Sequence, residues 1–126
     1  MPPILVVDDD PDYREFLMTV LERSGVDGIG AASGAEALDI LERQPCAGAI
    51  VDIVMAGMDG LELVRALRAA GRTVPILTLT GGCVGQRSPY LNAALALGAD
   101  MAACKGGSEL GPIRALVERA RAAAPA

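Results

Sequence analysis

The sequence predicts an α/β fold, in which five parallel strands form one sheet with helices on both of its faces. Short apolar runs alternate five times with longer segments of helical periodicity along the 126 residues. The apolar runs are hydrophobic at consecutive positions, as in strands that are covered on both faces. The length suits a single domain, and the hydrophobic content of 52% is sufficient for a packed core.

Each element follows from its own local signals. The predicted strands are residues 4–7, about 26–31, 48–53, 74–79 and 101–104. We expect the first helix to begin at Pro11, with Asp10 as its cap, and to end at Gly25. A capping box from Ser33 to Glu36 begins the second helix, which continues to residue 41. Apolar residues at helical spacing predict the remaining helices over 61–67, 89–97 and about 113–122.

Composition and charge exclude several classes of protein. The 16 acidic and 11 basic residues give a net charge of −5, which repels phosphate backbones and argues against direct nucleic-acid binding. No apolar run approaches the roughly 18 residues that cross a bilayer. The N-terminus carries no basic stretch ahead of an apolar one, so it does not resemble a signal peptide. We therefore expect a cytoplasmic protein without a membrane segment.

The cysteines predict neither a zinc site nor a disulfide framework. Cys46, Cys83 and Cys104 are odd in number, lie far apart in the sequence and are accompanied by no histidine. We expect three ordinary thiols in a reducing compartment. The absence of histidine also removes the commonest general base near neutral pH.

Polar residues follow four of the five predicted strands. Asp8 and Asp9 come after the first strand, Asp52 after the third, Thr80 after the fourth and Lys105 after the fifth. Lys105 is also the only lysine in a chain that otherwise uses arginine. Because the carboxyl ends of parallel strands meet at one edge, where α/β proteins bind ligands, these side chains are expected to share a site.

The chemistry of this residue set indicates phosphoryl transfer. Converging carboxylates repel one another and need a cation, and all-oxygen ligands suit a hard ion such as Mg²⁺. A lysine and a hydroxyl beside the metal would neutralise and orient a phosphoryl group. One of the carboxylates could itself be the nucleophile and form an aspartyl phosphate.

Four segments give the chain a resemblance to the receiver domain of two-component response regulators. They are ILVVDDDP at 4–11, VDIVMAGMDG at 51–60, PILTLTG at 75–81 and GADMAACK at 98–105. The resemblance implies a flavodoxin-like, doubly wound sheet with the strand order 2-1-3-4-5 and five helices. It also implies a single receiver domain over residues 1–124, with no output domain in this chain.

The resemblance implies a role for each residue of the metal site. Asp52 matches the phosphoacceptor, which takes its phosphoryl group from a phosphohistidine in a Mg²⁺-dependent reaction. Asp9 matches a direct metal ligand and Asp8 its acidic partner, which often acts through water. The backbone carbonyl of Val54 matches a further ligand of the metal.

The resemblance also implies the remaining site residues and the partners. Thr80 matches the hydroxyl that moves toward the phosphoryl group, and Lys105 matches the lysine that pairs with it. The donor would be a histidine kinase or a histidine phosphotransfer protein, and the signal would pass to a downstream protein effector or output domain. A homodimer is a further expectation at the level of the family.

Three positions depart from the family pattern. Ala56 and Gly106 stand where prolines are usual, and Ala102 stands where an aromatic residue usually couples to the threonine. The stretch after Thr80 is longer than usual and rich in glycine at its start. A hinge in the loop Gly81–Gly85 is therefore expected to replace the aromatic switch.

Two other functions are consistent with the same residues. A phosphatase of the haloacid dehalogenase type would use Asp8 as its nucleophile, with Asp10 two residues later. Such an enzyme needs a late acidic pair, for which only Glu109 and Glu118 are available, and both are interpreted as helix residues. A receiver-like binding module that works without phosphorylation is the second alternative.

Overall fold

Ten elements alternate strictly between strand and helix in the computed structural model, which describes residues 1–107 and 109–123. The strands are β1 (Ile4–Val7), β2 (Gly28–Ala31), β3 (Gly48–Asp52), β4 (Ile76–Thr80) and β5 (Met101–Cys104). The helices are α1 (Pro11–Arg23), α2 (Gly34–Arg43), α3 (Gly60–Ala69), α4 (Pro89–Leu97) and α5 (Leu110–Ala123). The end of the domain predicted at residue 124 lies outside the described residues.

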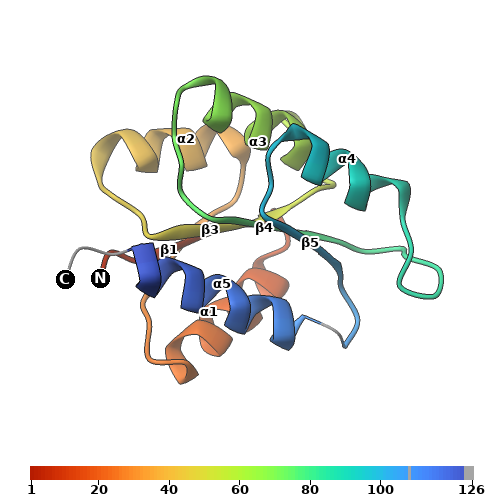
Figure 1. Cartoon of the computed structure of the whole chain (residues 1–126), viewed down its shortest axis with the longest axis horizontal. Coiled ribbons are helices and arrows are strands. Elements are labelled where there is room, and N and C mark those ends of the chain that lie inside the picture. Colours follow the sequence, from red (N-terminus) through yellow and green to blue (C-terminus); the bar gives the residue numbers. More distant parts are fainter. Residues whose placement is uncertain (108, 124–126) are drawn as a thin grey trace.

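The five strands form one parallel sheet in the order β2-β1-β3-β4-β5, as expected. Helices α2, α3 and α4 cover one face of the sheet, and α1 and α5 cover the other (Figure 1). The predicted doubly wound α/β fold is therefore confirmed. No helix in the described part of the chain is long and apolar enough to cross a membrane.

Each face of the sheet carries its own hydrophobic core. Successive residues of β1 point to opposite faces, so Leu5 and Val7 join the core under α2, α3 and α4, and Ile4 and Val6 join the core under α1 and α5. All four residues are fully buried. This arrangement explains why the central strands are apolar at every position rather than at alternate ones.

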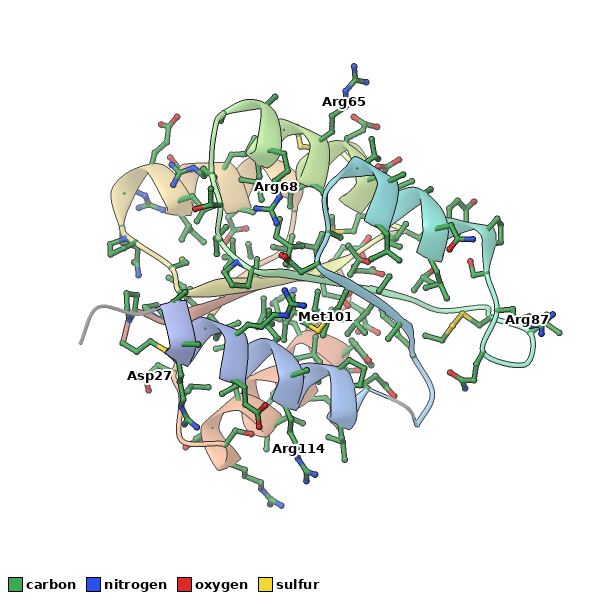
Figure 2. All side chains as sticks on the ribbon, in the orientation of Figure 1. Asp27, Arg65, Arg68, Arg87, Met101 and Arg114 are labelled. Atoms are coloured by element: carbon green, nitrogen blue, oxygen red, sulfur yellow. A yellow bond between two sulfur atoms is a disulfide. The ribbon has the colours of Figure 1, made fainter. Side chains whose placement is uncertain are left out.

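Arg68 ties α3 to the segments that lead into β4 and β5 (Figure 2). Its Nε donates to the carbonyl of Gly98 at 2.9 Å and its Nη1 to that of Val74 at 2.8 Å. Its Nη2 pairs with Asp100 at 2.9 Å, and the same carboxylate oxygen accepts the N–H of Ile76 at 2.8 Å. One guanidinium thereby satisfies several backbone groups at the amino end of the sheet.

Most of the predicted helix starts are confirmed by their caps. Asp10 accepts the N–H of Asp12, and Ser33 accepts the N–H of Glu36. The last helix begins earlier than predicted, at Leu110 instead of residue 113. Pro112 lies in the first turn of this helix, where the N–H groups have no helical partners, so a proline is tolerated there.

Three strands also differ from the prediction at their ends, and β3 ends at Asp52, one residue before the predicted end. β4 begins at Ile76, two residues later than expected, and includes Thr80. Pro75 precedes it and has no N–H to contribute to the ladder. β2 begins at Gly28, so the predicted start at residue 26 was too early.

The expectation of three ordinary thiols is wrong, because Cys83 and Cys104 form a disulfide (Figure 2). Thr80 pairs with Cys104 across neighbouring strands, and Cys83 lies only three residues beyond Thr80. The Cα atoms of the two cysteines are 6.1 Å apart, within the range that a disulfide bridges. Cys46 is free and half-buried, and burial raises the pKa of its thiol.

We expect the disulfide to stabilise the fold measurably, because it closes a loop across a sequence separation of 21 residues. Loops of this size are worth about 3–3.5 kcal/mol in the chain-entropy model. Urea denaturation with and without a reducing agent measures the difference, and Cys83→Ser should show the same loss and no response to reductant. Cys46→Ser is the matched control and should behave as wild type. Three free thiols in protein purified without reductant would contradict the bond.

Candidate functional site

Four strand ends meet at the carboxyl edge of the sheet and deliver the predicted polar residues there. Asp8 follows β1 directly, Asp52 is the last residue of β3, Thr80 the last of β4, and Lys105 follows β5. Backbone bonds extend the ladder past the strand ends: the N–H of Asp8 donates to Ala31 at 3.1 Å and that of Lys105 to Thr80 at 2.8 Å. The sheet itself therefore fixes the spacing of these residues.

The three predicted acidic residues converge as expected. Asp8, Asp9 and Asp52 each present a carboxylate oxygen within 4.8 Å of the others. Asp8 and Asp52 are buried, with 1% and 5% of their surface exposed, whereas Asp9 is exposed. Two buried carboxylates at this separation are costly unless a positive charge lies between them.

Lys105 supplies that positive charge in this structure. Its Nζ lies 3.0 Å from Oδ2 of Asp8 and 3.3 Å from Oδ1 of Asp52. The ammonium also lies over the ring of Tyr13, 4.2 Å from the ring centroid. A cation–π contact of this kind is worth about 0.5–2 kcal/mol, depending on how far it is removed from water.

Burial, followed by the charge of Asp8, raises the pKa of the Asp52 carboxyl, which lies at about 6. Lys105 and the backbone at Val54 oppose the shift but do not cancel it. The site thus holds an anion that its surroundings only partly neutralise, which is an environment that favours binding of a second cation.

The acidic residues Asp8, Asp9 and Asp10, which precede α1, have two different structural roles. Asp10 caps the helix, as predicted, and its N–H donates to Oδ1 of Asp8 at 2.9 Å. Arg14, one turn along α1, donates to the backbone carbonyl of Asp8 at 2.7 Å. Asp9 accepts the N–H of Ala56 at 3.4 Å, across from the loop that follows β3. Asp8 and Asp9 therefore face the site while Asp10 belongs to the helix.

The donor set fits a hard divalent cation. Every candidate ligand is a carboxylate or carbonyl oxygen, and no thiolate or imidazole stands beside them, which suits Mg²⁺ better than Zn²⁺. Val54 lies in the loop directly after β3, where its backbone lowers the pKa of the Asp52 carboxyl. The part of its carbonyl as a metal ligand stays a prediction.

Thr80 lies at the carboxyl edge of the sheet, as predicted, but its hydroxyl bonds to the following loop rather than to the acidic cluster. It is fully buried, and its Oγ1 donates to the carbonyl of Gly81 at 3.2 Å. The loop beyond it forms a small turn closed by bonds between Val84 and Arg87, at 3.0 Å in each direction. Cys83 anchors that turn to β5 through the disulfide.

Two residues near Lys105 were missed by the sequence analysis. Tyr13 contacts its ammonium, and Glu109 bonds to Tyr13 and to the loop after Lys105. Tyr13 lies under the ammonium, and its hydroxyl donates to Oε2 of Glu109 at 2.7 Å. Glu109 was interpreted as a helix residue, but it precedes α5 and is buried. The only signal in the sequence was that Tyr13, one of three aromatic residues, stands close after the acidic triplet.

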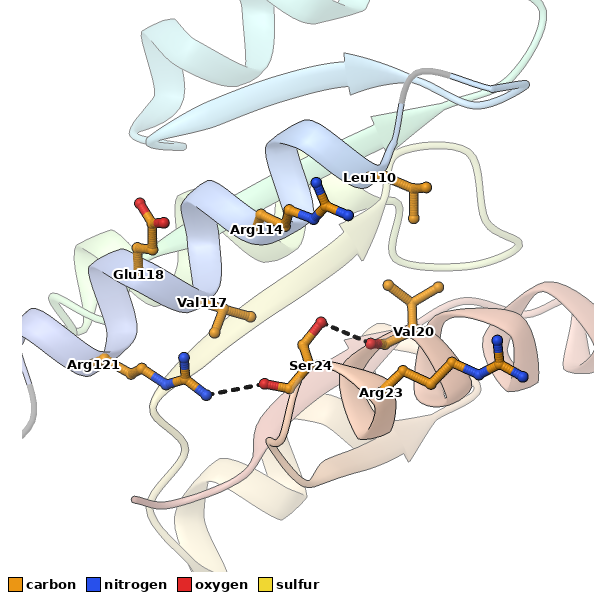
Figure 3. A pocket seen from close by; sticks show the side chains of 8 residues that line it. All are labelled: Val20, Arg23, Ser24, Leu110, Arg114, Val117, Glu118 and Arg121. Atoms are coloured by element: carbon orange, nitrogen blue, oxygen red, sulfur yellow. Dashed lines mark hydrogen bonds between the residues drawn. The ribbon is translucent and has the colours of Figure 1, made fainter.

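A separate groove of about 560 Å³ lies between α1 and α5, away from the acidic cluster (Figure 3). It is lined by Val20, Arg23, Ser24, Leu110, Arg114, Val117, Glu118 and Arg121. Arg121 closes one end by donating to the carbonyl of Ser24 at 2.9 Å. None of the predicted site residues lines this groove.

Gly60 keeps Asp52 in place, and we expect Gly60→Ala to displace it. A Cβ at this position would overlap the carbonyl oxygen of Asp52 and lie 2.7 Å from Cα of Ile53. Overpacking against backbone costs about 1–3 kcal/mol, so denaturation should show that loss together with weaker metal binding. Gly111→Ala is the control, because a Cβ there meets nothing within 4 Å. Wild-type stability and metal affinity in Gly60→Ala would contradict this account.

Asp52→Asn should stabilise the metal-free protein at neutral pH. The folded-state pKa of Asp52, about 6, exceeds its unfolded value. Ionised Asp52 therefore lowers the free energy of unfolding fully above about pH 6, and this loss is absent below the unfolded pKa. The gain is about 1–3 kcal/mol at roughly pH 7 and vanishes toward about pH 4. Urea denaturation in the presence of a chelator measures it, with the exposed Asp39→Asn as control. An equal gain at both pH values would contradict the raised pKa.

Comparison with known proteins identifies the family to which this chain belongs. A family model described as the response regulator receiver domain matches residues 4–109. The chain is 43% identical over 77 residues to the response regulator MprA of Mycobacterium sp. (strain KMS), covering 61% of this chain but 34% of that protein. It therefore spans about a third of that relative's length.

Solved structures give the same result over nearly the whole chain. The receiver domain of the Francisella response regulator 1452 superposes with a TM-score of 0.86 at 25% identity, covering 98% of this chain and 100% of that one. A response regulator receiver protein from Pseudomonas putida superposes with a TM-score of 0.81 at 31% identity, covering 94% and 96%. With its fold, its acidic edge and its family model in agreement, the chain belongs to the response regulator receiver domain family.

Proposed function

We propose that this receiver domain accepts a phosphoryl group on Asp52 from a phosphohistidine donor, in a reaction that requires Mg²⁺. The observation that carries the proposal is the convergence of Asp8, Asp9 and Asp52 with the single lysine at one sheet edge. The family model supports it. The proposed receiver unit is residues 1–124.

The residues of the edge would divide the chemistry as follows. A carboxylate oxygen of Asp52 attacks phosphorus, the bond from phosphorus to the donor's imidazole nitrogen breaks, and the imidazole leaves with the electron pair of that bond. Mg²⁺, held by Asp8, Asp9, Asp52 and the Val54 carbonyl, would neutralise the phosphoryl oxygens when bound.

Lys105 and Thr80 would then change partners. The ammonium would exchange Asp8 and Asp52, its partners here, for a phosphoryl oxygen. The Thr80 hydroxyl would exchange the carbonyl of Gly81 for another phosphoryl oxygen. These exchanges would alter the loop after β4, the segment expected to act as the hinge, and present a changed surface to a partner.

The domain would act as a signalling phosphoacceptor rather than as an enzyme that turns over an external substrate. Its proposed partners are a histidine kinase or a histidine phosphotransfer protein on one side and a protein effector or output domain on the other. We place it in the cytoplasm and include a homodimer among its proposed assemblies.

The arrangement of the late acidic residues speaks against the phosphatase alternative. Glu109 is bound to Tyr13 and to the N–H of Gly107, and Glu118 lies exposed on α5. Neither belongs to the cluster formed by the described carboxylates at the edge. The complete set of acidic residues and lysine favours phosphoryl chemistry over a binding module that works without it.

Intact-protein mass after incubation with a small acyl phosphate tests the proposal. We expect one phosphoryl adduct that requires Mg²⁺ and is absent in Asp52→Ala. An adduct that survives in Asp52→Ala and disappears in Asp8→Ala would favour the phosphatase. No adduct from either an acyl phosphate or a phosphorylated histidine kinase, on folded wild-type protein, would favour the phosphorylation-independent module.

A further inference from the structure

The bond from its N–H to Thr80 fixes the main chain of Lys105, but the residues that follow do little to fix the position of its ammonium. Lys105 is followed by Gly106 and Gly107, which adopt φ values of +105° and +119°. A Cβ at either glycine would meet nothing within 4 Å, so neither is packed against a neighbour. Lysine itself has a flexible four-carbon stem. Something outside this loop must therefore hold the side chain over the site.

Tyr13 provides that support from α1. The Lys105 Nζ is enclosed by Asp8 at 3.0 Å, Asp52 at 3.3 Å and the face of the Tyr13 ring, whose centroid is 4.2 Å away. The carboxylates draw the ammonium toward the acidic cluster, whereas the ring meets it without offering an anion. Contact with an aromatic face is also tolerant of direction, so the ammonium can change its carboxylate partner and remain on the ring.

Glu109 in turn holds Tyr13 and the glycine loop together. One carboxylate oxygen accepts the Tyr13 hydroxyl at 2.7 Å, and the other accepts the N–H of Gly107 at 2.6 Å. The backbone carbonyl of Glu109 accepts the N–H of Ile113 in the first turn of α5. Glu109 is thus the point at which α1, the loop after Lys105 and α5 are joined.

The protonation states of the pair keep this link closed near neutral pH. Burial raises the pKa of the Tyr13 phenol, and the hydrogen bond and charge of Glu109 raise it further, so the hydroxyl keeps its proton. Burial opposes ionisation of Glu109, but Tyr13 and the N–H groups of the loop outweigh it and hold the pKa below its usual value. A neutral phenol donating to a carboxylate is a charge-assisted hydrogen bond, which is stronger than a neutral one.

We propose that Tyr13, held in place by Glu109, is a positioning residue that keeps the Lys105 ammonium over the phosphoacceptor site. The inference rests on the proposed phosphorylation of Asp52 and extends it to residues outside the acidic edge. Tyr13 and Glu109 would fix the position of the Lys105 side chain, which Gly106 and Gly107 do not restrict. Loss of the ring should free the lysine without removing a metal ligand.

The single lysine makes a direct test possible. Lysine labelled with ¹³C gives one set of side-chain signals, and protons above an aromatic ring are shifted upfield by its ring current. We expect that shift in wild type and in Tyr13→Phe, and its loss in Tyr13→Leu. Tyr90→Leu is the matched control, because Tyr90 is the other tyrosine and lies exposed at the start of α4.

The second readout is the rate of phosphorylation by an acyl phosphate in saturating Mg²⁺. We expect Tyr13→Leu to lower the rate roughly two- to thirtyfold with unchanged Mg²⁺ affinity, and Glu109→Gln to cause a smaller loss. In a Lys105→Ala background, Tyr13→Leu should have no further effect, because it acts through the lysine.

Three results would overturn the inference. They are a wild type without the ring-current shift, a Tyr13→Leu variant with the wild-type rate, and an equal loss in the Lys105→Ala background. A wild type that shows the shift and accepts no phosphoryl group would contradict the proposed function while supporting the contact. The two failures are therefore distinguishable.

Discussion

The structure depends on placing two buried carboxylates, Asp8 and Asp52, side by side at the end of an apolar sheet. Their mutual repulsion and loss of water must be offset by a cation. In this structure the cation is the Lys105 ammonium, which bridges both. The same electrostatic demand can be met by a metal, and this shared demand links the resting arrangement to the proposed reaction. Because the ammonium of Lys105 sits on a flexible side chain, a metal ion could take its place beside Asp8 and Asp52.

The fold supplies the rigidity that such a site needs. Both faces of the sheet are covered, so the strand ends cannot shift without disturbing two hydrophobic cores. Gly60 lets the start of α3 pack directly on the backbone of Asp52. The Arg68 network fixes the opposite end of β4 and β5. The proposed reaction would therefore act on the ends of β4 and β5, where Thr80 and Lys105 would change partners.

Much of this could be predicted from the sequence, because the signals were local. Apolar runs ending in acidic residues placed Asp8 and Asp52 at one edge, and side-chain caps marked α1 and α2. The contacts that were missed join distant segments. Tyr13 and Glu109 are 96 residues apart, and only the packing of α5 beside α1 brings them together. Cys83 and Cys104 meet because of strand register, which the spacing of the cysteines does not reveal. The early start of α5 was missed because its first residue, Leu110, is exposed and lies before the apolar spacing that begins at residue 113.

The disulfide also divides the molecule topologically. It closes a covalent ring that contains the whole of α4 and the whole of β5, the strand at the sheet edge. An edge strand without such a tether can fray from its carboxyl end. Here fraying of β5 cannot carry its last residue, Cys104, far from the end of β4, because the disulfide joins Cys104 to Cys83, three residues beyond Thr80. An opening of β5 at its carboxyl end therefore leaves Cys104 tethered to the loop after β4, which limits how far Lys105 can move from Thr80.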